Sequence, residues 1–162
     1  MTDNEKYAVS DKVKSALGNI VLSLEQPRPN RIYVMVHQDN FPKAARIIYE
    51  KLGGRLATST GLETRDAIEL LYHFMLDADH VLCNLKTLVM KPELKVGSVG
   101  AFLPAAEWIE REIAEMYGVT FIGHPDPRHL LLHETWPEGN FPWRKDYPQN
   151  PGAFSEEKPV VY

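Results

Sequence analysis

The sequence predicts an α+β fold: a largely antiparallel sheet with helices packed on one face, followed by an extended, proline-rich C-terminal arm. Short apolar, β-branched runs alternate with segments of helical periodicity, which is typical of this fold class. Seven of the 12 prolines lie in the last forty of the 162 residues, where they exclude a long helix or an internal strand. We therefore expect an α+β domain over residues 1–118 and a C-terminal arm over residues 119–162.

The order of elements follows from local signals. Ser10 can cap a first helix that stops at Gly18, and the apolar runs 19–25 and 31–37 are separated by a turn that contains two prolines. A second helix, entered at Asp39 or Asn40, ends at Gly53.

Three further strands are expected at residues 55–60, 67–76 and 80–90. The last of them alternates clearly, so one face should carry Val81, Cys83, Leu85, Thr87 and Val89. On that face, Cys83 is expected to be a small buried hydrophobe rather than a nucleophile.

A third helix is predicted over residues 105–117, entered at Pro104 and stopped by Gly118. On a helical wheel one apolar arc contains Ala105, Ala106, Ile109, Ile113, Met116 and Tyr117. Glu107, Arg111 and Glu115 follow at intervals of four residues, so Arg111 is expected to pair with both glutamates.

Glu112 falls at the margin of this apolar arc, where an unpaired carboxylate would be costly to desolvate. Three interpretations remain open. Glu112 forms a structural salt bridge that attaches the C-terminal arm to the helix, or it contacts another subunit, or it handles protons with a raised pKa.

The C-terminal arm carries large aromatic side chains that a disordered tail would not need, namely Trp136, Phe141, Trp143, Tyr147 and Phe154. An extended segment has too little structure of its own to bury them. They must lie against the chain's own domain or against a partner, because aromatic residues are also enriched in interface cores.

Composition excludes several functions. With 18 basic and 22 acidic side chains interspersed, the net charge of −4 leaves no basic surface for nucleic acid. The single cysteine excludes an internal disulfide and an iron–sulfur cluster held by this chain alone. Without a signal peptide or an apolar run of spanning length, we expect a soluble chain made in the cytoplasm.

No catalytic set or phosphate-binding glycine loop is predicted. His124, His129 and His133 are spaced five and four residues apart, but two prolines interrupt the segment and no glutamate lies between the last pair as a metalloprotease needs. A free-standing enzyme that binds a metal through these histidines is therefore kept only as a rival hypothesis.

The stretch from residue 110 to 131 resembles the signature of the 30 kDa subunit family of respiratory complex I, which has homologues in energy-converting membrane-bound [NiFe] hydrogenases. The resemblance rests on two groups of residues. The first is Glu110-Arg111-Glu112, Glu115-Met116-Tyr117-Gly118, Phe121, Gly123-His124-Pro125-Asp126, Arg128 and Leu130-Leu131. The second, Pro142-Trp143-Arg144-Lys145-Asp146-Tyr147-Pro148, is similar to the family's PLRKDYP, with Trp143 in place of leucine.

This resemblance implies a subunit of an oxidoreductase complex that holds no cofactor itself. Iron–sulfur clusters, and possibly a [NiFe] centre, would belong to partner chains. The partners would be a large catalytic subunit (hydrogenase type or complex I 49 kDa-like), an iron–sulfur small subunit, a ferredoxin-like subunit and membrane ion-translocating subunits. The chain would lie peripherally on the cytoplasmic face of the membrane, with its C-terminal arm on the large subunit.

Within the family, Trp136-Pro137-Glu138-Gly139 resembles the hydrogenase branch more than the NADH:quinone branch, which stays the alternative. We expect the four charged helix residues Glu110, Arg111, Glu112 and Glu115 to form an ionic lattice with Arg128, Arg144 and Lys145. That lattice would fix the arm on the large subunit. A transient assembly adaptor is the remaining rival.

Overall fold

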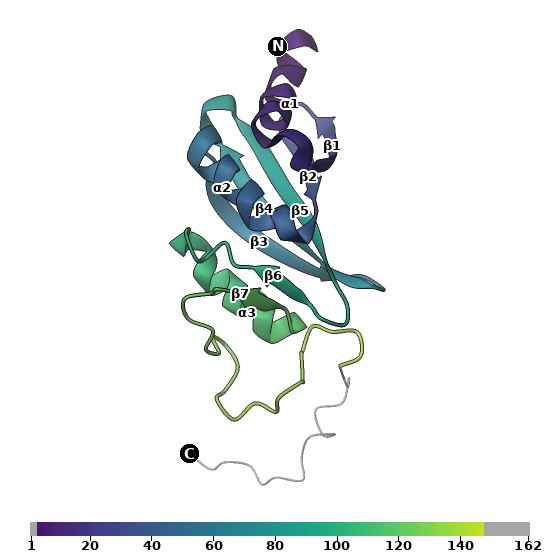
Figure 1. The fold of residues 1–162 in the computed structure, drawn as a ribbon, viewed down its shortest axis with the longest axis vertical. Coiled ribbons are helices and arrows are strands. Elements are labelled where there is room, and N and C mark those ends of the chain that lie inside the picture. Colours follow the sequence, from purple (N-terminus) through teal and green to yellow (C-terminus); the bar gives the residue numbers. More distant parts are fainter. Residues whose placement is uncertain (1–2, 148–162) are drawn as a thin grey trace.

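The computed structural model describes residues 3–147 and confirms the predicted α+β fold (Figure 1). A five-stranded sheet has the order β1-β2-β5-β4-β3, and every pair in it is antiparallel except β2 with β5. The elements are α1 (Asp3–Leu17), β1 (Val21–Arg28), β2 (Arg31–Val36), α2 (Phe41–Leu52), β3 (Arg55–Glu63), β4 (Ala67–Leu76), β5 (Val81–Met90), β6 (Lys95–Gly97), α3 (Glu107–Tyr117) and β7 (Thr120–Ile122).

The long hairpin of β4 and β5 forms the centre of the sheet and pairs without a break from Ala67–Met90 to Leu76–Val81. Alternation along β5 is confirmed, since all five predicted core residues are buried. Cys83 is one of them, and burial raises the pKa of its thiol to about 12, so the thiol is not ionised near neutral pH.

Helices α2 and α3 both pack on the face of the sheet that carries Tyr72 of β4. From α2, Phe41 meets Tyr72 of β4 edge to face at 4.8 Å. From α3, Tyr117 lies over Gly61 of β3, where a Cβ atom would come within 2.8 Å of the Tyr117 ring. Glycine in β3 therefore permits the close approach of α3 to the sheet.

Glycine also ends both helices as predicted. Gly53 and Gly118 adopt the left-handed conformation, with φ angles of 65° and 79°, and the N–H of Gly118 donates to the carbonyl of Ala114.

Some elements differ from the sequence-based expectation. The first helix begins at Asp3 rather than at Ser10, and Pro104 lies in a 3₁₀ turn before α3. Strands β6 and β7 form a separate parallel pair that was not predicted, because three residues are too few to show an alternating pattern.

The boundary predicted at residue 118 falls two residues before β7, which returns to pair with β6. From residue 123 to 147 the C-terminal arm has no helix or strand. Pro148, Pro151, Phe154 and Pro159 lie outside the described residues. Among residues 3–147, no helix is both long and apolar enough to cross a membrane.

Candidate subunit-docking site

Helix α3 buries two carboxylates, and they are not the one expected. Glu110 and Glu115 are buried, whereas Glu112 is only partly buried and has no hydrogen bond or ion pair with a described residue. The salt bridge expected between Glu112 and the C-terminal arm is not found among residues 3–147, and a contact of Glu112 with another subunit or a role in proton handling stays a prediction. A helical wheel shows the apolar arc of α3 but not which loops cover its flanks. In the structure, residues 98–100 cover Glu110 on one flank of α3, and the C-terminal arm covers Glu115 on the other.

Glu110 joins α3 to the sheet. Its side chain has no exposed surface, and it accepts hydrogen bonds from the hydroxyls of Tyr72 at 2.7 Å and Ser98 at 2.5 Å. The backbone N–H groups of Val99 and Gly100 donate at 2.8 and 3.3 Å. Burial raises the pKa of Glu110 despite these four donors. Glu110 therefore serves as a buried hydrogen-bond acceptor that joins α3 to β4 and to residues 98–100.

His124 lies beside this site, with Nε2 at 3.9 Å from a Glu110 oxygen. Its Nε2 donates to the carbonyl of Glu107 at 3.0 Å, and its Nδ1 accepts from the N–H of Asp126 at 3.0 Å. These bonds fit a neutral imidazole that holds the start of the arm against α3.

Arg111 does not pair with Glu107 and Glu115 as predicted. Its guanidinium donates to the carbonyls of Arg128 at 2.8 Å and His129 at 2.6 Å, and it lies 3.4 Å from Asp126. The predicted pairing was wrong because the arm returns along α3 and supplies nearer acceptors. Arg111 therefore binds the arm backbone.

Glu115 is the second contact between α3 and the arm. Its carboxylate accepts from three successive backbone N–H groups, those of Leu130 at 3.0 Å, Leu131 at 2.8 Å and Leu132 at 3.3 Å. His129 Nδ1 lies 3.2 Å from the same carboxylate. Consecutive N–H groups that converge on one anion form a nest, so Glu115 fixes the backbone of the arm here.

Glu63, at the end of β3, is the third contact and was missed. It accepts from Lys91 Nζ at 2.6 Å and from the N–H of Lys145 at 2.5 Å, and Arg144 Nε lies 3.4 Å away. Burial opposes ionisation, but the bonds from Lys91 and Lys145 outweigh it and lower the pKa of Glu63. Arg144 also donates to the carbonyl of Tyr117 at 3.2 Å.

The expected ionic lattice is therefore corrected. None of its three arm cations pairs with an acidic side chain of α3 among the described residues. Arg128 forms a bidentate pair with Asp126 at 2.7 and 2.8 Å, and Arg144 Nε lies 3.4 Å from Glu63. Lys145 also contacts Glu63, but through its backbone N–H rather than its ammonium group. Asp146 lies 3.6 Å from Arg144 and is exposed.

Two tryptophans of the arm are placed by these contacts. Trp143 donates its backbone N–H to Met116 and meets the Tyr117 ring at 5.6 Å, yet it stays 50% exposed. Trp136 stacks on Tyr147 at 6.5 Å, and its indole N–H donates to the carbonyl of Asn140 at 2.8 Å.

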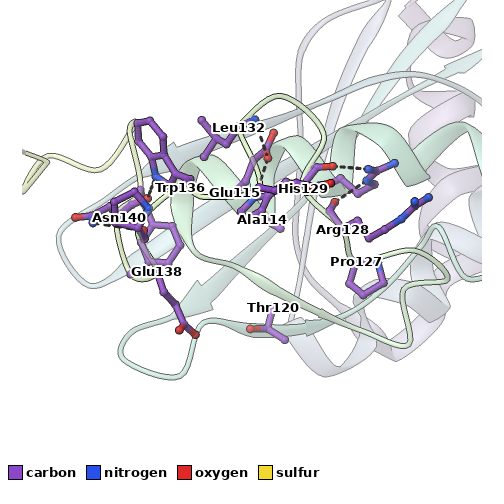
Figure 2. Close-up of a pocket in the computed structure, with 15 residues that line it drawn as sticks. Ala114, Glu115, Thr120, Pro127, Arg128, His129, Leu132, Trp136, Glu138 and Asn140 are labelled. Carbon is purple, nitrogen blue, oxygen red and sulfur yellow. Dashed lines mark hydrogen bonds and ion pairs between the residues drawn. The ribbon is translucent and has the colours of Figure 1, made fainter. Parts of the chain in front are cut away.

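A cavity of about 650 Å³ lies between α3 and the arm, as Figure 2 shows. Its apolar wall includes Ala114, Leu132, Trp136 and Phe141. Its polar lining includes Glu115, Thr120, Arg128, Glu138 and Asn140.

The three clustered histidines make separate contacts. His124 and His129 bind as described above, and His133 Nδ1 lies 2.9 Å from the Thr135 hydroxyl. Within residues 3–147 no three His, Cys, Asp or Glu side chains gather closely enough to hold a metal ion.

The sequence matches the family described as the respiratory-chain NADH dehydrogenase 30 Kd subunit over residues 34–152. It is 30% identical to hydrogenase-4 component G of Escherichia coli strain K12, over 90% of this chain and 27% of that protein. It is 34% identical to the NADH-quinone oxidoreductase C/D subunit of Pseudomonas aeruginosa strain UCBPP-PA14, over 79% of this chain and 22% of that protein. The chain thus spans about a quarter of the length of these curated relatives.

The fold is also similar to that of a chain in the membrane-bound sulfane sulfur reductase, an archaeal respiratory membrane complex. The TM-score is 0.76 at 21% identity, over 87% of this chain and 84% of that one. At this level of identity the likeness shows a shared fold.

Proposed function

Because the chain belongs to the respiratory-chain NADH dehydrogenase 30 Kd subunit family, we propose that it is a non-catalytic, peripheral subunit of a membrane-bound oxidoreductase complex. Its C-terminal arm docks on the large catalytic subunit. Clusters and any [NiFe] centre belong to partner chains, as do the membrane ion-translocating subunits. The chain itself lies on the cytoplasmic face of the membrane.

The uneven exposure of the arm region carries this proposal. Its backbone is held by Glu115, Arg111 and Glu63, while Leu131 stays 62% and Trp143 50% exposed. On the adjacent face of α3, Trp108 is 71% exposed. Large apolar side chains on a fixed backbone are typical of interface residues, since ordering them costs little entropy on binding.

The hydrogenase branch is the finer proposal, and the Trp136-Pro137-Glu138-Gly139 run favours it. An NADH:quinone-type complex is the alternative. Nickel analysis of the purified complex separates the two: stoichiometric nickel and a large subunit with two CxxC pairs support the hydrogenase, and their absence supports a quinone or another acceptor.

Docking by the arm is tested by charge reversal. Arg144→Glu places a second carboxylate beside Glu63 and removes the donor to Tyr117, so residues 141–147 should leave the domain. The tagged chain, purified from its own cell in mild detergent, should then lose the large subunit while its circular dichroism stays unchanged.

Arg55→Glu is the matched control, because Arg55 forms an exposed pair with Asp77 on the sheet domain. It should retain the large subunit. If Arg144→Glu also retains it, the arm is not the docking element. If the wild-type chain is purified alone, the family membership describes the fold and not a role in a complex.

A further inference from the structure

The cavity between α3 and the C-terminal arm has a wall that the chain itself maintains. The indole N–H of Trp136 donates to Asn140, the ring stacks on Tyr147, and the backbone N–H of Trp136 donates to His133. On the opposite side, Glu115 holds residues 130–132. Hydrogen bonds and ring stacking within the chain therefore hold both walls of the cavity in place.

Charge in this cavity is not balanced. Both lining arginines are already occupied, because Arg128 forms a bidentate pair with Asp126 and Arg111 binds Asp126 and two carbonyls. Glu134 lines the same cavity and interacts with Arg128 only through longer-range electrostatics. Glu138 has no hydrogen bond or ion pair with any residue of 3–147, and in Figure 2 its carboxylate extends toward the side on which Thr120 lies. The uncompensated charge is negative.

We propose that the cavity receives a basic segment of the large subunit, with an arginine or lysine side chain against Trp136 and its charge at Glu138. This inference rests on the proposed function and adds the chemistry of the partner. A carboxylate without a partner attracts a guanidinium or ammonium group, and the apolar wall that includes Trp136 can pack against the aliphatic part of such a side chain. The volume of about 650 Å³ is in the range that holds a drug-sized ligand, so it accommodates a short segment rather than one side chain.

Other occupants fit less well. The chain's own residues 148–162 carry Glu156 and Glu157 against Lys158, which adds negative charge to a negative site. A small anion is disfavoured for the same reason.

The test uses the whole complex purified through the tagged chain. Glu138→Lys should lower the amount of large subunit retained per chain by about tenfold, because like charges that meet across an interface are strongly unfavourable. Glu138→Gln should lower it less. Glu93→Lys is the matched control, since Glu93 is exposed and pairs with no described residue, and it should retain the large subunit fully.

Direct identification of the occupant uses p-benzoylphenylalanine in place of Thr120, followed by irradiation and peptide mass spectrometry. The expected adduct joins this position to a large-subunit peptide that contains arginine or lysine. An adduct with residues 148–162, with another subunit or with a peptide without basic residues would overturn the inference. So would the absence of any adduct at Thr120 while the same photoreactive residue at Leu131 reaches the large subunit.

If wild-type chain and Glu138→Lys retain the large subunit equally, the cavity is not its docking site although the subunit role stands. If the wild-type chain retains no large subunit, the subunit role itself fails.

Discussion

The sheet domain and the C-terminal arm use α3 in opposite ways. Toward the domain, α3 buries Ile113 and Met116 together with Glu110, whose four hydrogen-bond donors all come from the domain. Toward the arm, α3 offers Glu115 and Arg111, which bind backbone groups and leave the apolar side chains of the arm partly uncovered.

This difference separates the contacts that the chain completes by itself from the apolar surface that the proposed large subunit would cover. Glu110 is fully buried and takes its four donors from the domain itself, so it contributes to the stability of the fold. The backbone beneath the half-exposed Leu131 and Trp143 is already fixed. Covering these side chains with a second surface therefore costs little further conformational entropy.

The largest expected effect is on the domain side. Glu110→Ala leaves the Tyr72 hydroxyl and the Val99 and Gly100 N–H groups buried without an acceptor, so the free energy of unfolding should fall by about 3 kcal/mol. Urea denaturation followed by circular dichroism measures this. Glu110→Gln, which keeps an acceptor, should lose much less, and equal losses would contradict the account of the site.

A smaller effect is expected where the arm crosses the end of α3. Gly118 has a φ of 79°, and a Cβ atom there would come within 2.6 Å of the Phe141 ring. Gly118→Ala should therefore cost about 2 kcal/mol, roughly half from backbone strain and the rest from displacement of Phe141. It should also change the tryptophan fluorescence, because all three tryptophans lie on α3 or the arm.

Gly123→Ala is the control for strain alone. Gly123 has a φ of 80°, and a Cβ atom added there would meet no other atom within 4 Å. It should cost about 1 kcal/mol and leave the fluorescence unchanged. If both variants change the fluorescence alike, the contact between Gly118 and Phe141 does not position the arm.

The arm contact at Glu115 should matter least for global stability. Its donors are only partly buried, and water replaces the lost acceptor, so Glu115→Ala should change the free energy of unfolding by about 1 kcal/mol or less. Amide hydrogen exchange at residues 130–132 should nevertheless accelerate about tenfold. Glu112→Ala, on the same helix without a described partner, should leave those rates unchanged.

The buried carboxylates Glu110 and Glu63 also predict pH effects of opposite sign. The raised pKa of Glu110 means that the folded state binds a proton more tightly, so its contribution to stability increases as pH falls toward about 4.3, the ordinary glutamate pKa. The lowered pKa of Glu63 gives a contribution that is present above about 4.3 and lost below it, as pH falls through the folded pKa.

Unfolding free energies across this range measure both contributions. Glu110→Gln should flatten the pH dependence of the unfolding free energy above about pH 4.3, and Glu63→Gln should flatten it below that pH. An unchanged profile in either variant would contradict the pKa direction assigned to that residue.

Local patterns predicted the regular parts of the molecule. Alternation located β4 and β5, and the left-handed glycines located the ends of α2 and α3, because these signals lie within single elements. The parallel pairing of β2 with β5 and the short pair β6–β7 depend on distant segments, so no local pattern reveals them.

The candidate site was predicted as a region but not as a set of contacts. Helix periodicity could not separate Glu110 and Glu115 from Glu112, because loops distant in sequence decide which flank of α3 is covered. Glu63 shares the core face of β3 with Ser59 and Gly61, and a carboxylate in that alternation was the available signal. Ser59 and Gly61 are small, so they made the apolar alternation of β3, and with it the burial of Glu63, hard to recognise from the sequence.

Hydrogen exchange of the isolated chain and of the same chain in its purified complex tests the central claim most directly. The account predicts that amides of residues 127–143 exchange at least about tenfold more slowly in the complex, while those of β4 and β5 are unchanged. Protection confined to the sheet domain, with the arm exchanging equally in both samples, would contradict docking through the arm.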